Sequence, residues 1–489
     1  MGLFTIKPAV PDAHAAAADQ PQLGRTLSAT SLVVLGVSSS IGAGLFVLTG
    51  TAAAHYAGPA VALSYLVAGL GCLCAGLCYA EFAALSPRTG SAYSYAYATM
   101  GELVAWIIGW DMVLEFLFSG VTVAVGWSGY FCGLLSAWGI HVPDAFASSP
   151  LRFDSDHRLQ LTGAVFDLPA AVLIAVESGL LYVGMRESAR FLSAVVALLL
   201  AVIALIVVAS IPFINPLNWH PFVPANTGTW GRFGWSGVMT AAAVVFFAYT
   251  GFESVSAATR EAKVPSRDIP IGVLGSFAIC AVAYVSIALV MTGLARYTTL
   301  AGSEPMISAL ANAGPGLAWL IPIVSVGIVF GLAAAPIGSL YAQSRLLFAM
   351  AEDGLLPSPF AAVHPSFKTP HRATAVVGLF AVVTAGLLPL ELLGELVSIG
   401  TLLAFVIVCA SVLILRARKP NIPRPFRTPG SPYVPALGIL TCVYMMLSLP
   451  TDTWIRLGVW LAVGLLLYAL FGHRHSRAAQ SESEGSRIG

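Results

Sequence analysis

Two long apolar stretches of this chain are each interrupted by small and polar residues whose backbone could bind a ligand. The first interruption is Ser38 to Gly44, within the apolar run 31–54, and the second is Tyr249 to Ser254, within the run 235–258. Irregular backbone is tolerated inside a bilayer only where it lines a cavity. Freed amides and carbonyls could there bind the carboxylate and the ammonium group of a small zwitterion.

Two carboxylates are expected near the middle of the membrane. Glu115 lies within the apolar run 101–133, and Glu253 lies in the second interruption. A carboxylate is costly in hydrocarbon, so a functional role is the default interpretation for both. Each could pair with a cationic side chain of a substrate, bind a proton, or hold helices together through hydrogen bonds. Asp111, one turn before Glu115, is expected nearer the inner surface.

The composition shows what kind of element must position these residues. Hydrophobic residues are 57% of the chain and charged residues only 10%, a balance foreign to soluble domains of 489 residues. Apolar stretches of about 20 residues, enough to cross a bilayer, recur along the sequence. We therefore predict an all-α integral membrane protein. Its twelve expected membrane-spanning helices are 31–54, 59–85, 101–133, 168–186, 190–212, 235–258, 270–294, 317–350, 373–388, 394–416, 434–449 and 454–471.

The positions of the two interruptions predict an internal repeat. They fall in the first and sixth expected helices, so helices 1–5 (about 31–212) and 6–10 (about 235–416) would form a 5+5 inverted repeat. Helices 11 and 12 (about 434–471) lie outside the repeat. We expect one transporter domain over 26–472, preceded by a short tail, 1–25. The Ser- and Glu-rich segment 473–489 is expected to be a disordered tail.

Charged residues predict the orientation in the membrane. With the N-terminus inside, all but five of the 24 Lys and Arg residues fall in cytoplasmic segments. This bias follows the positive-inside rule and predicts a multi-pass protein of the plasma membrane with both termini cytoplasmic. The net charge of +1 gives no indication of a nucleic-acid partner.

The seven cysteines indicate no further chemistry. Their spacing suits neither a metal site nor an outer-loop disulfide. We expect them to be small packing residues, with no metal, no cofactor and no disulfide-linked heavy subunit, in a protein that works as a monomer.

Several short motifs between about residue 25 and residue 477 resemble one family of membrane proteins. They are Gly36 to Phe46 followed by Val47-Leu48-Thr49-Gly50, Tyr79-Ala80-Glu81-Phe82, Gly90 to Glu102, Gly109 to Glu115, Gly126-Trp127-Ser128, Phe246 to Ile271, Arg345 to Pro357 and Pro425 to Pro429. In combination they resemble the amino acid–polyamine–organocation superfamily, and within it a bacterial homologue of the cationic amino acid transporters. The resemblance implies a repeat of the leucine-transporter type.

The resemblance also implies a substrate site at the two interruptions. Amides of Gly42, Ala43 and Gly44 would face the substrate carboxylate, and carbonyls near Phe247, Ala248 and Thr250 would take its ammonium group. The remaining expected members of the site are Ser39, Ser40, Glu115, Glu253 and Ile337. The alternative is that these glycines have no role in binding and only let the helices pack closely.

Coupling to an ion is where the sequence departs from its relatives. Proton-coupled relatives carry a lysine nine residues after the arginine of a Glu-Ser-Ala-Arg motif. Here that motif ends at Arg190, and the matching position is Leu199. Residues 331–335 likewise lack the hydroxyls that bind sodium in the wider fold. Uniport or exchange is therefore expected, unless Glu115 or Glu253 carries a proton.

The sequence gives conflicting indications about the substrate. Glu115 and Glu253 favour a cationic side chain, whereas an apolar Ile337 would narrow the pocket for small neutral ones. We expect an L-amino acid carried by alternating access, with arginine, lysine or ornithine first and alanine-like amino acids second. A membrane amino acid sensor is a further alternative, although such proteins usually carry a long folded tail. No motif of an enzyme occurs in the chain.

Overall fold

A computed structural model of the protein describes residues 27–85, 91–153, 159–184, 189–252, 255–256, 262–367 and 369–476. Glu253, the N-terminal tail 1–25, residues 477–489 of the expected C-terminal tail and the first two residues of the Glu-Ser-Ala-Arg motif lie outside the described residues. The side chain of Arg190 is likewise not described.

Helices dominate the part of the chain that the structure describes. The labelled helices are α1 Ala29–Ser40, α2 Thr49–Ala52, α3 Val61–Leu85, α4 Ser91–Thr99, α5 Glu102–Ala137, α6 Leu168–Val183, α7 Ala189–Ser210, α8 Gly234–Val245, α10 Pro265–Leu294, α11 Pro305–Asn312, α12 Leu320–Leu332, α13 Ala335–Glu352, α14 His371–Leu387, α15 Leu390–Arg418, α16 Tyr433–Ser448, α17 Thr451–Leu467 and α18 His473–His475. Within these described ranges, seven helical stretches are long and apolar enough to cross a membrane, and five shorter helices are also apolar.

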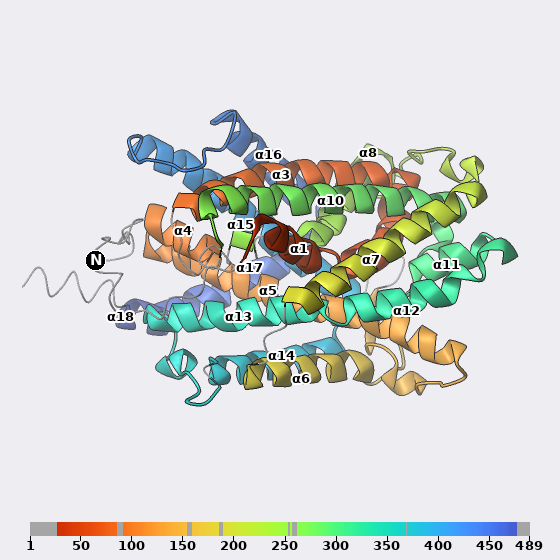
Figure 1. Ribbon diagram of the computed structural model, residues 1–489, viewed down its shortest axis with the longest axis horizontal. Coiled ribbons are helices and arrows are strands. Elements are labelled where there is room, and N and C mark those ends of the chain that lie inside the picture. The colour runs from red at the N-terminus through yellow and green to blue at the C-terminus, as the bar shows by residue number, and fades with distance from the viewer. Residues whose placement is uncertain are drawn as a thin grey trace, which may run out of the picture.

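The long helices run together along one axis of the molecule. Figure 1 shows α3, α10 and α13 lying lengthwise, with α6 and α14 side by side along one edge. The helix α1 lies in the middle of this view and packs against α10, α7 and α13. Residues near the end of α1 are therefore enclosed by segments from distant parts of the sequence.

The first predicted interruption is present. Helix α1 is capped by Ser28, whose hydroxyl oxygen accepts a hydrogen bond from the Ser31 amide at 3.2 Å. It ends at Ser40, and Ile41 is extended, with φ −76° and ψ 103°. A π-helical segment, Gly44–Leu48, follows and continues into α2. Such π-helical turns often occur at functional sites, because they leave backbone groups out of the regular ladder.

The second predicted interruption is also present in the described residues. Helix α8 tightens into a 3-10 turn, Phe246–Tyr249, and Thr250 is then extended with ψ 149°. Gly251 has φ +114°, a conformation that side chains other than glycine rarely adopt. The helix therefore ends at this point; it is not a continuous helix with a bend.

A third discontinuity was not predicted. The expected helix 317–350 is divided at Ala333 and Ala334, where α12 ends and α13 begins. Pro336 lies in the first turn of α13, a position that proline tolerates because the first amides of a helix have no intrahelical partner. That proline is the signal in the sequence that could have located the division.

Three further features were not predicted. The loop between α5 and α6, expected to lie outside the membrane, contains a small antiparallel pair of strands, β1 Leu151–Phe153 with β2 Leu159–Leu161. The segments α4 and α11, which lie outside the twelve expected spans, are helical. The last helical turn continues to His475, three residues beyond the expected end of the transporter domain. Long hydrophobic stretches predict membrane-spanning helices well, but short helices and hairpins between them lack a long hydrophobic stretch.

Candidate functional site

The two interrupted segments cross each other at close range. A Cβ atom on Gly44 would stand 2.6 Å from the Cα atom of Ala248, and one on Gly251 would overlap the carbonyl oxygen of Ser39. Both crossings are backbone against backbone, so no side-chain rearrangement could make room. The structure therefore brings three predicted site residues, Ser39, Gly44 and Ala248, together with Gly251, and it explains why glycine occurs at both crossings.

A buried tyrosine of α10 joins the two interruptions. The hydroxyl of Tyr284 lies 3.0 Å from the carbonyl oxygen of Ser40 and 2.5 Å from that of Ala248. A hydroxyl has one proton, so it can donate to only one of these carbonyls at a time. Tyr284 is fully buried and packs against Tyr65 and Tyr249, with ring centroids 5.4 and 5.0 Å away.

A second tyrosine holds the start of the π-helical segment. The hydroxyl of Tyr65 donates to the Gly44 carbonyl at 3.0 Å and lies 2.6 Å from Thr49 Oγ1. Tyr249 in turn donates its hydroxyl to the Tyr65 carbonyl at 3.0 Å. The segment that carries the predicted amides is therefore fixed by α3 as well as by α10. Gly42, Ala43 and Gly44 are all buried, and no side chain caps the segment that begins at Gly44.

Two of the three carbonyls predicted for an ammonium group, those of Phe247 and Ala248, already accept hydrogen bonds. Phe247 O accepts from both the amide (3.1 Å) and the hydroxyl (2.8 Å) of Thr250. Ala248 O lies against the Tyr284 hydroxyl. In the conformation described, a ligand at Phe247 would have to share or displace a bond made by Thr250, so binding there requires a local rearrangement.

The serines of the first interruption face a more open region. The hydroxyls of Ser38 and Ser39 both donate to the Leu35 carbonyl, at 2.8 and 2.9 Å. Ser40 is buried and Ser39 half-buried. Across from Ser39, a Cβ on Gly338 of α13 would meet only the Ser39 hydroxyl, at 3.8 Å, and Gly338 is exposed. The neighbouring Ile337 is half-buried.

Helix α5 forms an apolar wall beside the first interruption. A Cβ on Gly126 would lie 2.7 Å from the Ala43 side chain, and one on Gly42 would lie 3.2 Å from Val123. Glu115 is 2% exposed and lies eight residues before Val123 on the same helix. At 1.5 Å per residue it is offset by roughly 12 Å along the helix axis from the level of Gly42. Glu115 is thus at a different depth from the crossing.

A second carboxyl group on α5 was given no role from the sequence. Asp111 is fully buried, and within the described residues neither of its carboxylate oxygens has a hydrogen-bond partner. It lies against α15, where a Cβ on Gly400 would be 3.1 Å from its Oδ1. An isolated carboxyl group in a membrane interior is costly, which marks Asp111 as a candidate functional residue. Its occurrence in an apolar run was the available signal.

The position that departs from proton-coupled relatives is packed with hydrocarbon. Leu199 of α7 is 2% exposed, and its Cδ1 would lie 2.5 Å from a Cβ on Gly331 of α12. Val202, one turn later, packs in the same way against Gly327. Glycines on α12 accept branched side chains from α7, and this interface has no room for an ammonium group and its hydration.

Comparison with known proteins decides the family. The family model described as amino acid permease matches residues 26–467, which include every described element of the site. The chain belongs to the amino acid permease family. This permease is 43% identical to the methylthioribose transporter of Bacillus subtilis (strain 168) and 41% identical to its branched-chain amino acid permease BcaP. Each alignment covers 97% of this chain and 98% of the relative.

Cationic amino acid transporters are also among its relatives. The permease is 38% identical to cationic amino acid transporter 4 of Homo sapiens, over 83% of this chain and 62% of that longer protein. The expected membership of the superfamily is therefore confirmed, as is the expectation that the chain is a transporter and not an enzyme.

Proposed function

We propose that this permease carries neutral, aliphatic L-amino acids across the plasma membrane by alternating access. The observation that supports the proposal most is the close crossing of the two interruptions, Gly44 against Ala248, with Ser39 beside Gly251. This arrangement gathers peptide groups of both polarities at one place inside a helical bundle. A zwitterionic backbone needs amide donors and carbonyl acceptors of that kind.

The walls of the crossing favour a neutral side chain. Ala43 and Val123 beside the crossing are apolar, as are Phe247 and Ile337, which adjoin Ala248 and Gly338 in the sequence. Glu115 is displaced by roughly 12 Å along α5. Two relatives with nearly full coverage are named for a branched-chain amino acid and for methylthioribose, neither of which is cationic by name. The first expectation, arginine, lysine or ornithine, becomes the second candidate. It rests on Glu115, Glu253 and the relatives named as cationic amino acid transporters.

We infer a topology of twelve crossings. The long stretch Gly44–Leu85 contains Gly58, whose φ of +61° would let the chain turn between the end of the first crossing and α3. Counted in this way, the seven long stretches and the five shorter apolar helices allow twelve crossings, and we propose that the first ten form the 5+5 inverted repeat. The distribution of Lys and Arg supports cytoplasmic termini. A monomer without a disulfide-linked subunit remains our proposal.

Alternating access would work by movement of the joined interruptions against α5 and α13. Tyr284 connects the two segments, so α1, α8 and α10 would move as one body. On α13, Gly338, Tyr341 and Arg345 are exposed along one face, and α1 packs beside this helix. We infer that this face lines the path from the crossing to the cytoplasm.

We propose uniport or exchange as the mode of transport. Leu199 occupies the position of the coupling lysine of relatives, in an apolar interface. A proton could still be carried by Asp111, Glu115 or Glu253. Uptake that does not change with an imposed pH gradient, in the native protein and in Asp111→Asn, Glu115→Gln and Glu253→Gln variants, would support uniport or exchange. If uptake by the native protein depends on the pH gradient and one variant removes that dependence, the replaced residue is the proton carrier.

Ligand-dependent thermal stabilisation tests the proposed substrate. The purified protein would be unfolded by heat in the presence of each of the twenty L-amino acids, ornithine and methylthioribose. A ligand at 100 times its dissociation constant adds about 2.7 kcal/mol of stability, which is easily measured. Shifts with leucine, valine and alanine support the proposal. Shifts confined to arginine, lysine and ornithine would establish the second candidate.

A further inference from the structure

A cavity lined by arginines lies away from the substrate site, where α15 ends. It has a volume of about 200 Å³ and is lined by Arg416, Pro420, Arg424 and Arg427. The segment 416–432 contains no acidic residue. Glu81 reaches this region from α3, with Arg416 Nη2 at 2.6 Å and Arg424 Nε at 3.3 Å from its carboxylate. Three guanidinium groups and one carboxylate leave the cavity with a net positive charge.

Two of the three arginines are held in place. Arg424 donates through Nη1 to the carbonyls of Pro420 and Ile422, both at 3.1 Å, and through Nη2 to that of Lys419 at 2.9 Å. Its side chain is only 4% exposed. Arg416 is fixed by Glu81 and by the Thr428 carbonyl, at 3.2 Å. Fixed guanidinium groups lose little conformational entropy when they bind an anion, so this cavity is preorganised.

Hydrogen-bond donors remain available toward the cavity. Among the described residues, neither Nη1 of Arg416 nor any nitrogen of Arg427 has a protein partner, and Arg427 is exposed. The planar guanidinium group matches the oxygens of a phosphate and binds them through paired hydrogen bonds. The chemistry of the cavity therefore fits a phosphate group better than a neutral ligand.

An exposed apolar stripe follows the cavity residues closely along the chain. Helix α16 starts six residues after Arg427, and it packs on α3 and α15 while one face stays uncovered (Figure 1). The exposed side chains of that face are Tyr433, Leu437, Leu440, Tyr444 and Leu447. Their spacing of three and four residues places them on one side of the helix, over about 21 Å. That length suits an acyl chain lying along the protein.

We propose that the cavity binds the phosphate group of an anionic phospholipid whose acyl chains lie along this stripe of α16. The positive charge selects anionic lipids over zwitterionic ones, because the amine of a zwitterionic headgroup adds a like charge. Free phosphate shares the same chemistry, but it would not use the stripe. The site is separate from the substrate site, so it would act on stability or membrane placement.

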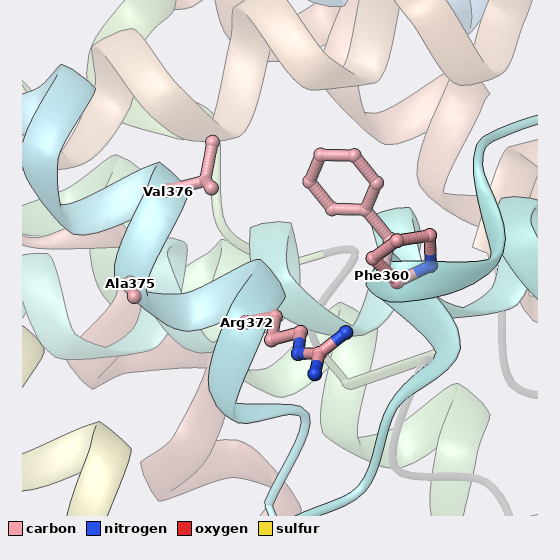
Figure 2. Close-up of a pocket in the computed structure, with 5 residues that line it drawn as sticks. Phe360, Arg372, Ala375 and Val376 are labelled. Atoms are coloured by element: carbon pink, nitrogen blue, oxygen red, sulfur yellow. The ribbon is translucent and has the colours of Figure 1, made fainter.

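Lipid binding to the full purified chain tests the proposal. The melting temperature and the bound lipid, counted by native mass spectrometry, would be measured with phosphatidylglycerol, phosphatidylcholine or inorganic phosphate. The test variant is Arg427→Gln, since Arg427 has no described partner whose loss would disturb folding. The matched control is Arg372→Gln. Figure 2 shows Arg372 on α14 beside a separate cavity, whose other lining residues, Pro359, Phe360, Ala375 and Val376, carry no charge.

Phosphatidylglycerol should bind and raise the melting temperature, whereas phosphatidylcholine should not. Arg427→Gln should weaken phosphatidylglycerol binding by about tenfold, the loss expected for a charged hydrogen-bonding partner. Arg427→Lys should recover part of it, and Arg372→Gln should bind as the native protein does. Equal binding of both lipids, or an unchanged affinity in Arg427→Gln, would overturn the proposal. If inorganic phosphate stabilises the protein as much as phosphatidylglycerol does, the cavity binds free phosphate and the proposed lipid site is wrong.

Discussion

The Cα atom of Ala248 lies 2.6 Å from the point where a Cβ atom on Gly44 would stand. Two segments separated by about 200 residues therefore meet with no space for a side chain between them. Close backbone approach of this kind requires glycine, and it fixes the relative positions of the peptide groups that we propose for substrate binding.

Replacing Gly44 with alanine should remove transport. The added methyl group meets backbone atoms, which cannot move aside as a flexible side chain can. Overpacking of about 1–3 kcal/mol would lower the fraction of protein in the binding-competent arrangement by about fivefold to a hundredfold. Uptake into proteoliposomes measures the effect. Gly179→Ala on α6, where nothing lies within 4 Å, is the matched control and should transport normally.

The bond between Tyr284 and the two interruptions should contribute to stability. Tyr284→Phe leaves the buried carbonyls of Ser40 and Ala248 without this donor, at a cost of about 1–3 kcal/mol. We expect a lower melting temperature and weaker substrate binding. Tyr444→Phe removes an equivalent hydroxyl from the exposed face of α16 and should change neither property. A Tyr284→Phe protein as stable as the native one would show that the bond is dispensable.

The exposed face of α13 should be accessible to water from the cytoplasm. In a Gly338→Cys variant, a membrane-impermeant thiol reagent should label the new thiol from the inner side, and substrate should slow the labelling. Six of the seven native cysteines are buried, and Cys132 is partly so, which keeps the background low. Gly179→Cys, on a position of α6 expected to face lipid, should label slowly with or without substrate. Equal labelling of the two would contradict the proposed path.

One outer carboxyl group should make stability depend on pH. Glu304 precedes α11 and packs against Gly133 of α5. Burial raises the pKa of its carboxyl group to about 7. The folded protein therefore binds this proton more tightly than the unfolded chain does. Protonation of Glu304 therefore stabilises the folded protein. This contribution is fully present below the pKa that the carboxyl group has in the unfolded chain, and it is lost as the pH rises through about 7.

The melting temperature should therefore fall between pH 5 and pH 8, and Glu304→Gln should reduce that fall. Asp167, at the start of α6, has a pKa raised to about 6 by burial and acts in the same direction, so a smaller slope should remain. Asp144→Asn, in the exposed part of the outer loop, serves as the control. If Glu304→Gln leaves the fall of melting temperature with pH unchanged, another group causes the pH dependence.

The long apolar helices were predictable because hydrophobicity over about 20 residues is a strong signal. The two interruptions were also predictable, since glycine and serine clustered inside an apolar stretch are typical of a helix that unwinds locally. The division between α12 and α13 was missed, although Pro336 indicated it. The hairpin at Leu151–Phe153 was missed because short outer strands carry no long-range pattern.

Contacts between distant segments were beyond reach of the sequence. The sequence placed Gly44 and Ala248 in one site but could not show that their backbones touch, or that Tyr284 joins them. The depth of Glu115 relative to Gly42 depends on how α5 packs beside α1, which periodicity does not specify. For the same reason Asp111, buried without a hydrogen-bond partner among the described residues, was given no role beforehand.

Uptake of radiolabelled leucine by proteoliposomes tests the central claim most directly. Unlabelled leucine, valine, alanine, arginine, lysine and ornithine would be compared as competitors, with the Gly44→Ala protein as the inactive control. The account predicts saturable leucine uptake that valine and alanine inhibit and that the three cationic amino acids leave unchanged. Absence of leucine uptake, together with arginine uptake that lysine and ornithine inhibit, would contradict it.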